Sequence, residues 1–269
     1  MRVSQYQLQR LLHLLRRKPL LGIGIIAVIA TLCSAELMPK EHDNNHDVQS
    51  FSSAKRLLPR IYQQLDNEFG NTSTIYCGCD ISYKNNGKNA IWSIDVDRCG
   101  FKSRNKNERT NRIEVEHVMP ASEFGSNLLC WKMGGRQKCS SNNDFKQMEG
   151  DMHNLYPAIG EINGDRGNLK FSEWNAKPTV YGKCKMVIDF EGNRVQPPVE
   201  ARGQIARAYL YMANKYNIRI SDQQKKLYLA WDKKYPATAM DCRRNELINK
   251  EQGNDNLYVT ASCRLAKAK

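Results

Sequence analysis

The sequence lacks the features that mark repeat, multidomain and zinc-dependent proteins. It has no internal repeat and no low-complexity tract, and between residues 50 and 269 no linker is long enough to demand two domains. It has neither the H-E-x-x-H helix motif nor the C-x-x-C knuckle that commonly hold zinc. Strand-like and helix-like segments are interspersed without regular βαβ alternation, which indicates a single mixed domain of the α+β class.

Acidic residues are absent from the first 18 positions, where five side chains are basic. An apolar run follows at 19–33 and ends in small residues, a pattern typical of a secretory signal peptide. We predict a signal peptide over 1–35, cleaved near Ala35. An uncleaved anchor is the weaker alternative, because about 15 apolar residues are short for the ~20 that a spanning helix needs. Residues 36–49 are polar and predict a flexible leader, and 50–269 form the folded domain.

Basic residues outnumber acidic ones by 41 to 28, which makes the formal net charge +13 and the isoelectric point about 9.3. Removal of the signal peptide, with its five basic residues, leaves a net charge of +8. Such a surface can simply keep an exported protein soluble, but it also suits a polyanionic partner, of which nucleic acid is the commonest. Six basic side chains gather in residues 98–112 and could follow a phosphate backbone.

Eight cysteines remain after removal of the signal segment, which holds Cys33. In an oxidising compartment an even number indicates disulfides, here up to four, although eight cysteines allow 105 connectivities. A zinc site built on the "CGC" at 77–79 is the alternative, but its spacing differs from the usual knuckle. The eight are Cys77, Cys79, Cys99, Cys130, Cys139, Cys184, Cys242 and Cys263.

Apolar and acidic residues alternate through "RIEVEHVMPA" at 112–121, which predicts a half-buried strand that breaks at Pro120. Successive strand side chains point to opposite faces. Glu116 and His117 can therefore flank one site only if the strand bends or ends there. Glu114 is interpreted as a solvated or supporting glutamate.

Weak helical periodicity over 149–168 predicts a helix, which Pro157 can open and Gly167 can end. Further predictions are a strand that turns at Gly192-Asn193, helices over 197–217 and after Ser221, and a helix over 50–65 that Pro59 kinks or delays.

Hydrolysis of a phosphodiester requires three kinds of group, and this chain offers each. A histidine can take a proton from water, carboxylate and amide oxygens can hold a hard divalent cation, and arginine suits phosphate oxygens. His117, the pair Glu116 and Asn163, and Arg136 fit these roles. Each also has a simpler explanation, as a hydrogen-bonded histidine, an Asn-Gly turn or a solvated arginine. Spacing therefore permits the site without establishing it.

Several blocks of sequence occur in a distinctive order: "RIEVEHVMPA", "FG" at 124–125, "CWKMGGRQKC", "MEGDMHNLYPAIGEINGDRGN", "YGKC", "ARGQIARAYLYM" and "GNDN". This is the order seen in the bacterial endonuclease I family of periplasmic and secreted nucleases. The chain resembles this family over residues 50–263, and its eight-cysteine pattern is similar as well. The resemblance implies a ββα-metal (His-Me finger) active site on a mixed α+β fold.

The resemblance also implies a role for each site residue. His117 is the general base that activates the attacking water. Glu116 and Asn163 are the direct protein ligands of one Mg²⁺ or Ca²⁺. Arg136 binds the scissile phosphate and stabilises its transition-state charge. Glu149 matches a carboxylate that acts near the metal through water.

The function implied is a secreted or periplasmic endonuclease that cuts double- and single-stranded DNA, and RNA as well, with little sequence specificity. The protein is expected to be a monomer with no stable protein partner and no membrane association beyond export. One alternative is a non-catalytic cationic protein that binds extracellular DNA, which the intact set of site residues disfavours. Another is a zinc hydrolase, which the spacing of "EVEH" disfavours.

Overall fold

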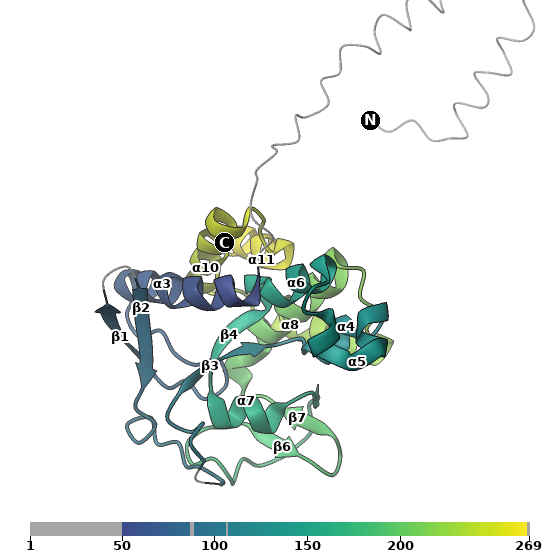
Figure 1. The fold of residues 1–269 in the computed structure, drawn as a ribbon. Coiled ribbons are helices and arrows are strands. Elements are labelled where there is room, and N and C mark those ends of the chain that lie inside the picture. Colours follow the sequence, from purple (N-terminus) through teal and green to yellow (C-terminus); the bar gives the residue numbers. More distant parts are fainter. Residues whose placement is uncertain (1–49, 87–88, 106, 268–269) are drawn as a thin grey trace, which may run out of the picture. The chain divides into compact units, whose positions relative to one another are not determined.

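The computed structural model describes residues 50–86, 89–105 and 107–267. The predicted signal peptide and leader fall outside the described residues. Figure 1 shows β3 and β4 in the middle of the domain, with α3, α10 and α11 on one side and α7 on the other. The helices are α3 (Phe51–Phe69), α4 (Ala121–Gly125), α5 (Leu129–Cys139), α6 (Asn143–Gly150), α7 (Gly160–Arg166), α8 (Val199–Lys215), α9 (Asp222–Lys234), α10 (Ala239–Gln252) and α11 (Leu257–Lys267).

The strands form three small sheets within the described ranges, not one large sheet. In the first sheet β1 (Ile81–Asn86) pairs with β2 (Asn89–Ile94), and in the second β3 (Ile113–His117) pairs with β4 (Leu155–Ile159), both antiparallel. The third has the order β5-β7-β6, built from β5 (Lys170–Phe171), β6 (Val187–Asp189) and β7 (Arg194–Gln196). Helices and strands thus mix in one domain, as the α+β prediction requires.

The strand predicted at 112–121 is β3, and it ends at His117 for a specific reason. Beyond His117, the N–H of Val118 donates to the carbonyl of Asn154. The Asn154 side chain then takes over the pairing, since it accepts from the N–H of Met119 and donates to the carbonyl of the same residue. Pro120 follows as the N-cap of α4. The regular pairing of the strands therefore ends at His117, and the chain turns into α4 at Pro120.

The predicted helix over 149–168 is wrong in its first part. Leu155–Ile159 is β4, a strand buried along its whole length. The weak helical periodicity was outweighed because β3 supplies hydrogen-bonding partners and the surrounding core buries both faces. Only Gly160–Arg166 is helical, and Gly167 ends that helix as predicted, at a φ of 49°.

The other predicted elements are present, with one difference at the first helix. α3 begins at Phe51, where Ser50 and Ser53 form a capping box, and it continues through Pro59. Pro59 therefore does not delay the helix. The predicted turn between β6 and β7, the helix α8, and the Ser221 cap of α9 are confirmed.

The core consists of two clusters that meet at β4. One cluster gathers around α8, with Tyr209 and Met212 fully buried, and includes Tyr156 of β4. The other joins α3 to α10 and includes Leu155. Neighbouring strand residues point to opposite faces, so β4 can contribute to both clusters. This burial holds β4, and through it β3, rigidly in place.

Four disulfides confirm the prediction that the cysteines pair. They are Cys77–Cys184, Cys79–Cys99, Cys130–Cys139 and Cys242–Cys263. The first joins positions 107 residues apart, and the third joins two cysteines within α5. Within the described part of the chain, no helix is both long and apolar enough to cross a membrane.

Candidate active site

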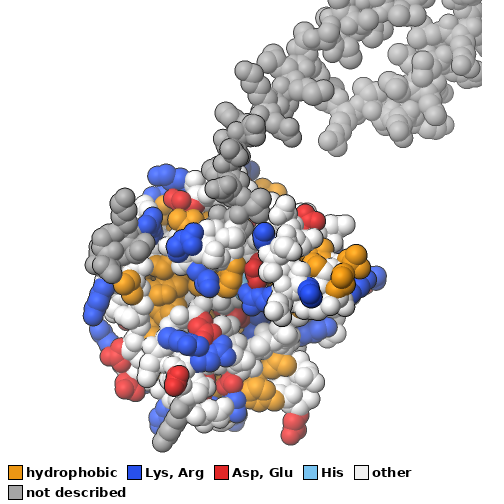
Figure 2. Space-filling view, in the orientation of Figure 1, with side chains coloured by type: hydrophobic (Ala, Val, Ile, Leu, Met, Phe, Trp, Pro, Cys, Tyr) orange, Lys and Arg blue, Asp and Glu red, His pale blue; other side chains and the backbone are white. Residues whose placement is uncertain are grey.

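A cavity of about 670 Å³ lies beside the end of β3. The four residues that the sequence nominated as base, metal ligands and phosphate ligand all line it: His117, Glu116, Asn163 and Arg136. Three further cations lie in its wall, Lys55 from α3 and Arg109 and Arg112 from the loop before β3. Lysine and arginine side chains are also distributed over the face of the molecule that Figure 2 shows. The fold therefore brings together the four nominated residues, which are up to 47 positions apart in the sequence.

His117 is held in one orientation and one protonation state. Its Nε2 lies 2.8 Å from the backbone carbonyl oxygen of Glu149, which can only accept a hydrogen bond. The proton of the neutral ring therefore sits on Nε2, and the lone pair on Nδ1 is available to accept a proton. The rings of Phe51 and Phe124 lie 4.5 Å and 6.0 Å from the imidazole. Burial lowers the pKa of His117 to about 3, so the ring is neutral at physiological pH.

Glu116 presents one carboxylate oxygen to the protein. Its Oε1 accepts hydrogen bonds from the hydroxyl of Tyr76 at 2.7 Å and from Nη1 of Arg166 at 3.0 Å. Among the described residues, these are the hydrogen bonds that Glu116 makes, so Oε2 is left for another ligand. The side chain is 3% exposed. Burial raises the pKa of Glu116, and the charge of Arg166 works against that rise.

Asn163 lies on α7 and is oriented by a glutamate of β3. Its Nδ2 donates to Oε2 of Glu114 at 2.7 Å. Its amide oxygen makes no hydrogen bond within the part of the chain that the structure describes, so this atom is available as a metal ligand. Glu114 in turn accepts from Arg109 at 2.6 Å and 2.9 Å and from Arg112 at 2.9 Å.

The ionisation of Glu114 follows from these contacts. Burial opposes the charged form of the carboxyl group, but the hydrogen bonds from Asn163 and the two arginines outweigh it and lower the pKa of Glu114. Glu114 is thus a charged residue that supports Asn163.

Arg136 is positioned by a break in α5. Gly134 and Gly135 depart from helical geometry, and Gly135 has a φ of 65°, a conformation that L side chains rarely adopt. After this break, Nε of Arg136 donates to Oε1 of Glu149 at 2.6 Å, and the guanidinium lies 5.4 Å from the centre of the Phe51 ring. The side chain is 51% exposed. Glu149 therefore holds Arg136 through its carboxylate and His117 through its backbone carbonyl.

Two supporting residues were missed by the sequence analysis. Arg166 is fully buried and donates to the carbonyls of His117 and Val118 as well as to Glu116. Its position three residues after Asn163 places both on one helix face, a signal that could have identified it. Tyr76 lies 40 residues from Glu116 in the sequence, and no spacing pattern links the two.

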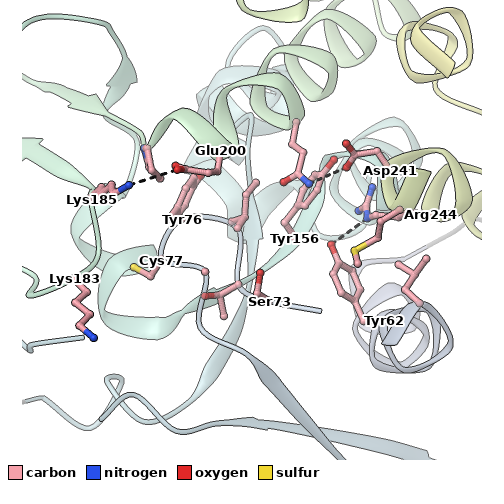
Figure 3. Close-up of a pocket in the computed structure, with 17 residues that line it drawn as sticks. Tyr62, Ser73, Tyr76, Cys77, Tyr156, Lys183, Lys185, Glu200, Asp241 and Arg244 are labelled. Atoms are coloured by element: carbon pink, nitrogen blue, oxygen red, sulfur yellow. Dashed lines mark hydrogen bonds and ion pairs between the residues drawn. The ribbon is translucent and has the colours of Figure 1, made fainter. Parts of the chain in front are cut away.

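A separate cavity of about 350 Å³ shares none of the nominated site residues. Tyr76 and Tyr156 form part of its wall, Lys185 forms an ion pair with Glu200, and Arg244 donates a hydrogen bond to the hydroxyl of Tyr62 (Figure 3). We therefore place the candidate chemistry in the larger cavity.

Among the residues that the structure describes, the two nominated as metal ligands do not belong to a cluster of the side chains that most often bind metal ions. In the described ranges no group of three or more histidine, cysteine, aspartate or glutamate side chains could hold a metal ion. One carboxylate and one amide oxygen in a shared cavity do, however, suit a hard cation that completes its coordination with water and substrate oxygens.

Comparison with known proteins agrees with the resemblance noted in the sequence. The profile of the family described as Endonuclease I matches residues 50–263. A periplasmic deoxyribonuclease of Aeromonas hydrophila is 46% identical over 246 residues, 91% of this chain and 95% of the relative. An extracellular deoxyribonuclease of the same organism is 50% identical over 216 residues, 80% of this chain and 91% of the relative. Endonuclease-1 of Buchnera aphidicola is 44% identical over 216 residues, 80% of this chain and 82% of the relative.

Proposed function

Because this chain belongs to the endonuclease I family, we propose that it is a periplasmic or secreted endonuclease that hydrolyses phosphodiester bonds of DNA. The observation that carries the proposal is one cavity lined by His117, with Nδ1 free to accept a proton, and by Glu116, Asn163 and Arg136. The relatives named as periplasmic and extracellular deoxyribonucleases support both the activity and the location.

The order of elements at the site supports a ββα-metal motif. β3 ends at His117, β4 pairs with it in antiparallel fashion, and α7 starts directly after β4 and carries Asn163. This short connection puts the histidine of the first strand and the asparagine of the helix on the same cavity. This order supports the motif that the sequence resemblance implies.

We assign Glu116 and Asn163 as the residues that would hold one Mg²⁺ or Ca²⁺. Their uncommitted atoms are a carboxylate oxygen and an amide oxygen, both hard ligands, and the remaining positions suit water and a phosphate oxygen. Such a cation, when bound, neutralises charge on the phosphate and stabilises the leaving oxygen. Tyr76 and Arg166 keep the Glu116 carboxylate fixed from behind.

His117 removes the proton of the attacking water at Nδ1. Because the pKa of the ring is lowered, the neutral form that accepts a proton predominates in the free protein. The carbonyl oxygen of Glu149 stabilises the imidazolium that forms, since it bears a partial negative charge and remains bonded to Nε2–H. The same hydrogen bond fixes the orientation of the ring in the wall of the cavity.

Arg136 binds the scissile phosphate. Its Nε is occupied by Glu149, which leaves the terminal nitrogens of a half-exposed guanidinium for phosphate oxygens. Recognition through phosphates carries no sequence information, and so we expect little sequence preference and cleavage of RNA as well as of DNA. Lys55, Arg109 and Arg112 extend the positive wall of the cavity.

The four disulfides and the predicted signal peptide support export to an oxidising compartment. We expect the exported protein to act as a monomer, since Glu116, His117, Arg136 and Asn163 of a single chain suffice to form the proposed site.

Cleavage of supercoiled plasmid tests the proposal. Oxidised protein comprising residues 36–269 is assayed with Mg²⁺ and with EDTA, beside His117→Ala. We expect metal-dependent cutting that His117→Ala abolishes while DNA binding persists. Binding by the unsubstituted protein without cutting in any divalent metal would support the alternative of a non-catalytic DNA-binding protein. Cutting that survives His117→Ala would remove the histidine from the role of base.

A further inference from the structure

A second cavity, of about 460 Å³, adjoins the candidate active site. Pro120 and Asn168 line both cavities, so the two meet where α4 begins and α7 has just ended. Lys170 lines the second cavity at the start of β5, and Arg219 lines it ahead of α9. None of the sequence patterns singled out Lys170 or Arg219.

The cations of this second cavity differ from the arginines that line the first. Arg109, Arg112 and Arg136 each form an ion pair with a glutamate. By contrast, Lys170 and Arg219 are exposed and form no salt bridge within the described ranges. Neither charge is held in an ion pair by any residue that the structure describes, so both are available to an anion.

Other groups of the cavity also suit an anion. The side-chain amides of Asn127 and Asn168 can donate hydrogen bonds, and Ser221 caps the N-terminus of α9, where the helix dipole favours negative charge. Glu123 is the opposing group. Its Oε2 accepts a hydrogen bond from Tyr209, and burial raises the pKa of its carboxyl group, while Lys170 offsets its charge.

We propose that this second cavity is a subsite for a phosphate that neighbours the scissile one on the same nucleic-acid strand, bound by Lys170 and Arg219. The inference rests on the proposed nuclease function and deepens it. A lysine supplies a point charge and an arginine a fork of donors, which together are the usual ligands of backbone phosphates. A strand that leaves the subsite past Pro120 and Asn168 enters the cavity that Arg136 and His117 line.

The subsite should affect only substrates that are long enough to reach it from the catalytic cavity. A duplex oligonucleotide occupies both cavities, whereas bis(p-nitrophenyl) phosphate has a single phosphate and occupies only the cavity of His117. The double variant Lys170→Gln, Arg219→Gln removes the two charges. The control Lys250→Gln, Arg264→Gln removes one exposed lysine and one exposed arginine from α10 and α11, which line neither cavity.

For the oligonucleotide we expect the double variant to raise KM about tenfold and to make the dependence of log KM on log salt shallower by about 2, one for each lost phosphate contact. kcat should stay within about twofold, and hydrolysis of bis(p-nitrophenyl) phosphate should not change. The control variant should shift KM by less than about twofold, since its charges act only through the general field of the protein.

Equal effects of the two variant pairs, or none from the first pair, would overturn the subsite. Loss of bis(p-nitrophenyl) phosphate hydrolysis in the double variant would also overturn it, because the change would then act on the catalytic cavity. If the unsubstituted protein hydrolyses neither substrate, the proposed function fails instead. DNA affinity measured in EDTA still tests the subsite in that case, with an about tenfold rise in Kd expected for the first pair alone.

Discussion

The side-chain amide of Asn163 on α7 donates a hydrogen bond of 2.7 Å to Oε2 of Glu114 on β3. This contact joins two elements whose residues are 49 positions apart. It fixes which atom of the amide faces Glu114 and which atom remains for a ligand. Two arginines hold Glu114 in turn, so the orientation of Asn163 depends on a network of four bonded side chains.

Removal of Glu114 should therefore weaken metal binding without removing a proposed ligand. We expect Glu114→Ala to raise the Mg²⁺ concentration for half-maximal DNA cleavage by about 10- to 100-fold, the usual effect of losing a residue that orients a ligand. Mg²⁺ titrations of cleavage rate measure this. Glu200→Ala is the control, because Glu200 is an exposed glutamate paired with Lys185. An unchanged Mg²⁺ requirement would show that Asn163 does not depend on Glu114.

Two arginines that pair with carboxylates should differ sharply in their effect on stability. Arg166 is fully buried, and Arg166→Leu leaves Glu116 as a buried charge without that partner, which costs about 3–5 kcal/mol. Arg104 pairs with Asp165 at the surface, and Arg104→Leu should cost about 0–1 kcal/mol. Urea denaturation at neutral pH compares the free energies of unfolding. Similar losses for the two variants would contradict the burial argument.

His153 should make the protein less stable as pH falls. It is buried against Tyr211, with Nε2 bonded to the carbonyl of Asn254, and burial lowers its pKa to about 4 despite the opposing charge of Asp151. Arg244 and Lys215 lower it further. An unfolded histidine has a pKa near 6.5, so below that pH the unfolded state binds a proton that the folded state does not. The stabilisation that depends on a neutral His153 is therefore complete above pH 6.5 and declines as the pH falls toward 4.

The variant His153→Gln isolates this effect. Between pH 7 and pH 5, the free energy of unfolding should fall by about 2 kcal/mol more in the unsubstituted protein than in the variant. Urea denaturation at both pH values gives the difference. Asp151 does not obscure it, because its pKa is lowered below its usual value and its contribution is lost only at more acidic pH. Parallel pH dependence in the two proteins would refute the assignment.

The contribution of each disulfide to the free energy of unfolding should increase with the length of the loop that it closes. In the loop-entropy description, Cys77–Cys184, with a separation of 107, stabilises by about 5 kcal/mol, and Cys130–Cys139, with a separation of 9, by about 2–3 kcal/mol. Paired Cys→Ser variants measured by urea denaturation should follow this order.

The long-range disulfide should also matter for activity. Cys77 follows Tyr76, whose hydroxyl holds Glu116, so we expect its loss to lower the cleavage rate as well as the stability. Protein with all four disulfides reduced should be poorly folded and largely inactive. Full nuclease activity in strong reductant would contradict this expectation.

Sequence alone was sufficient where the signal is local or where the order of motifs is distinctive. The alternation up to His117 predicted β3 and its end before Pro120, and the apolar stripe of α8 and the Ser221 cap of α9 predicted helices, because each depends on neighbours within a few residues. The ordered blocks nominated Glu116, His117, Arg136 and Asn163, whose roles remain predictions.

Tertiary structure alone decided the contacts between distant parts of the chain. Leu155–Ile159 forms a strand because β3 offers it hydrogen bonds, not because its own periodicity favours one. Glu149 is joined to His117 and Tyr76 to Glu116 across 32 and 40 residues. Such pairings depend on the packing of the whole domain, and no local pattern encodes them. For that reason the residue types of the site could be named from sequence, but the tautomer of His117 and the free oxygens of Glu116 and Asn163 could not.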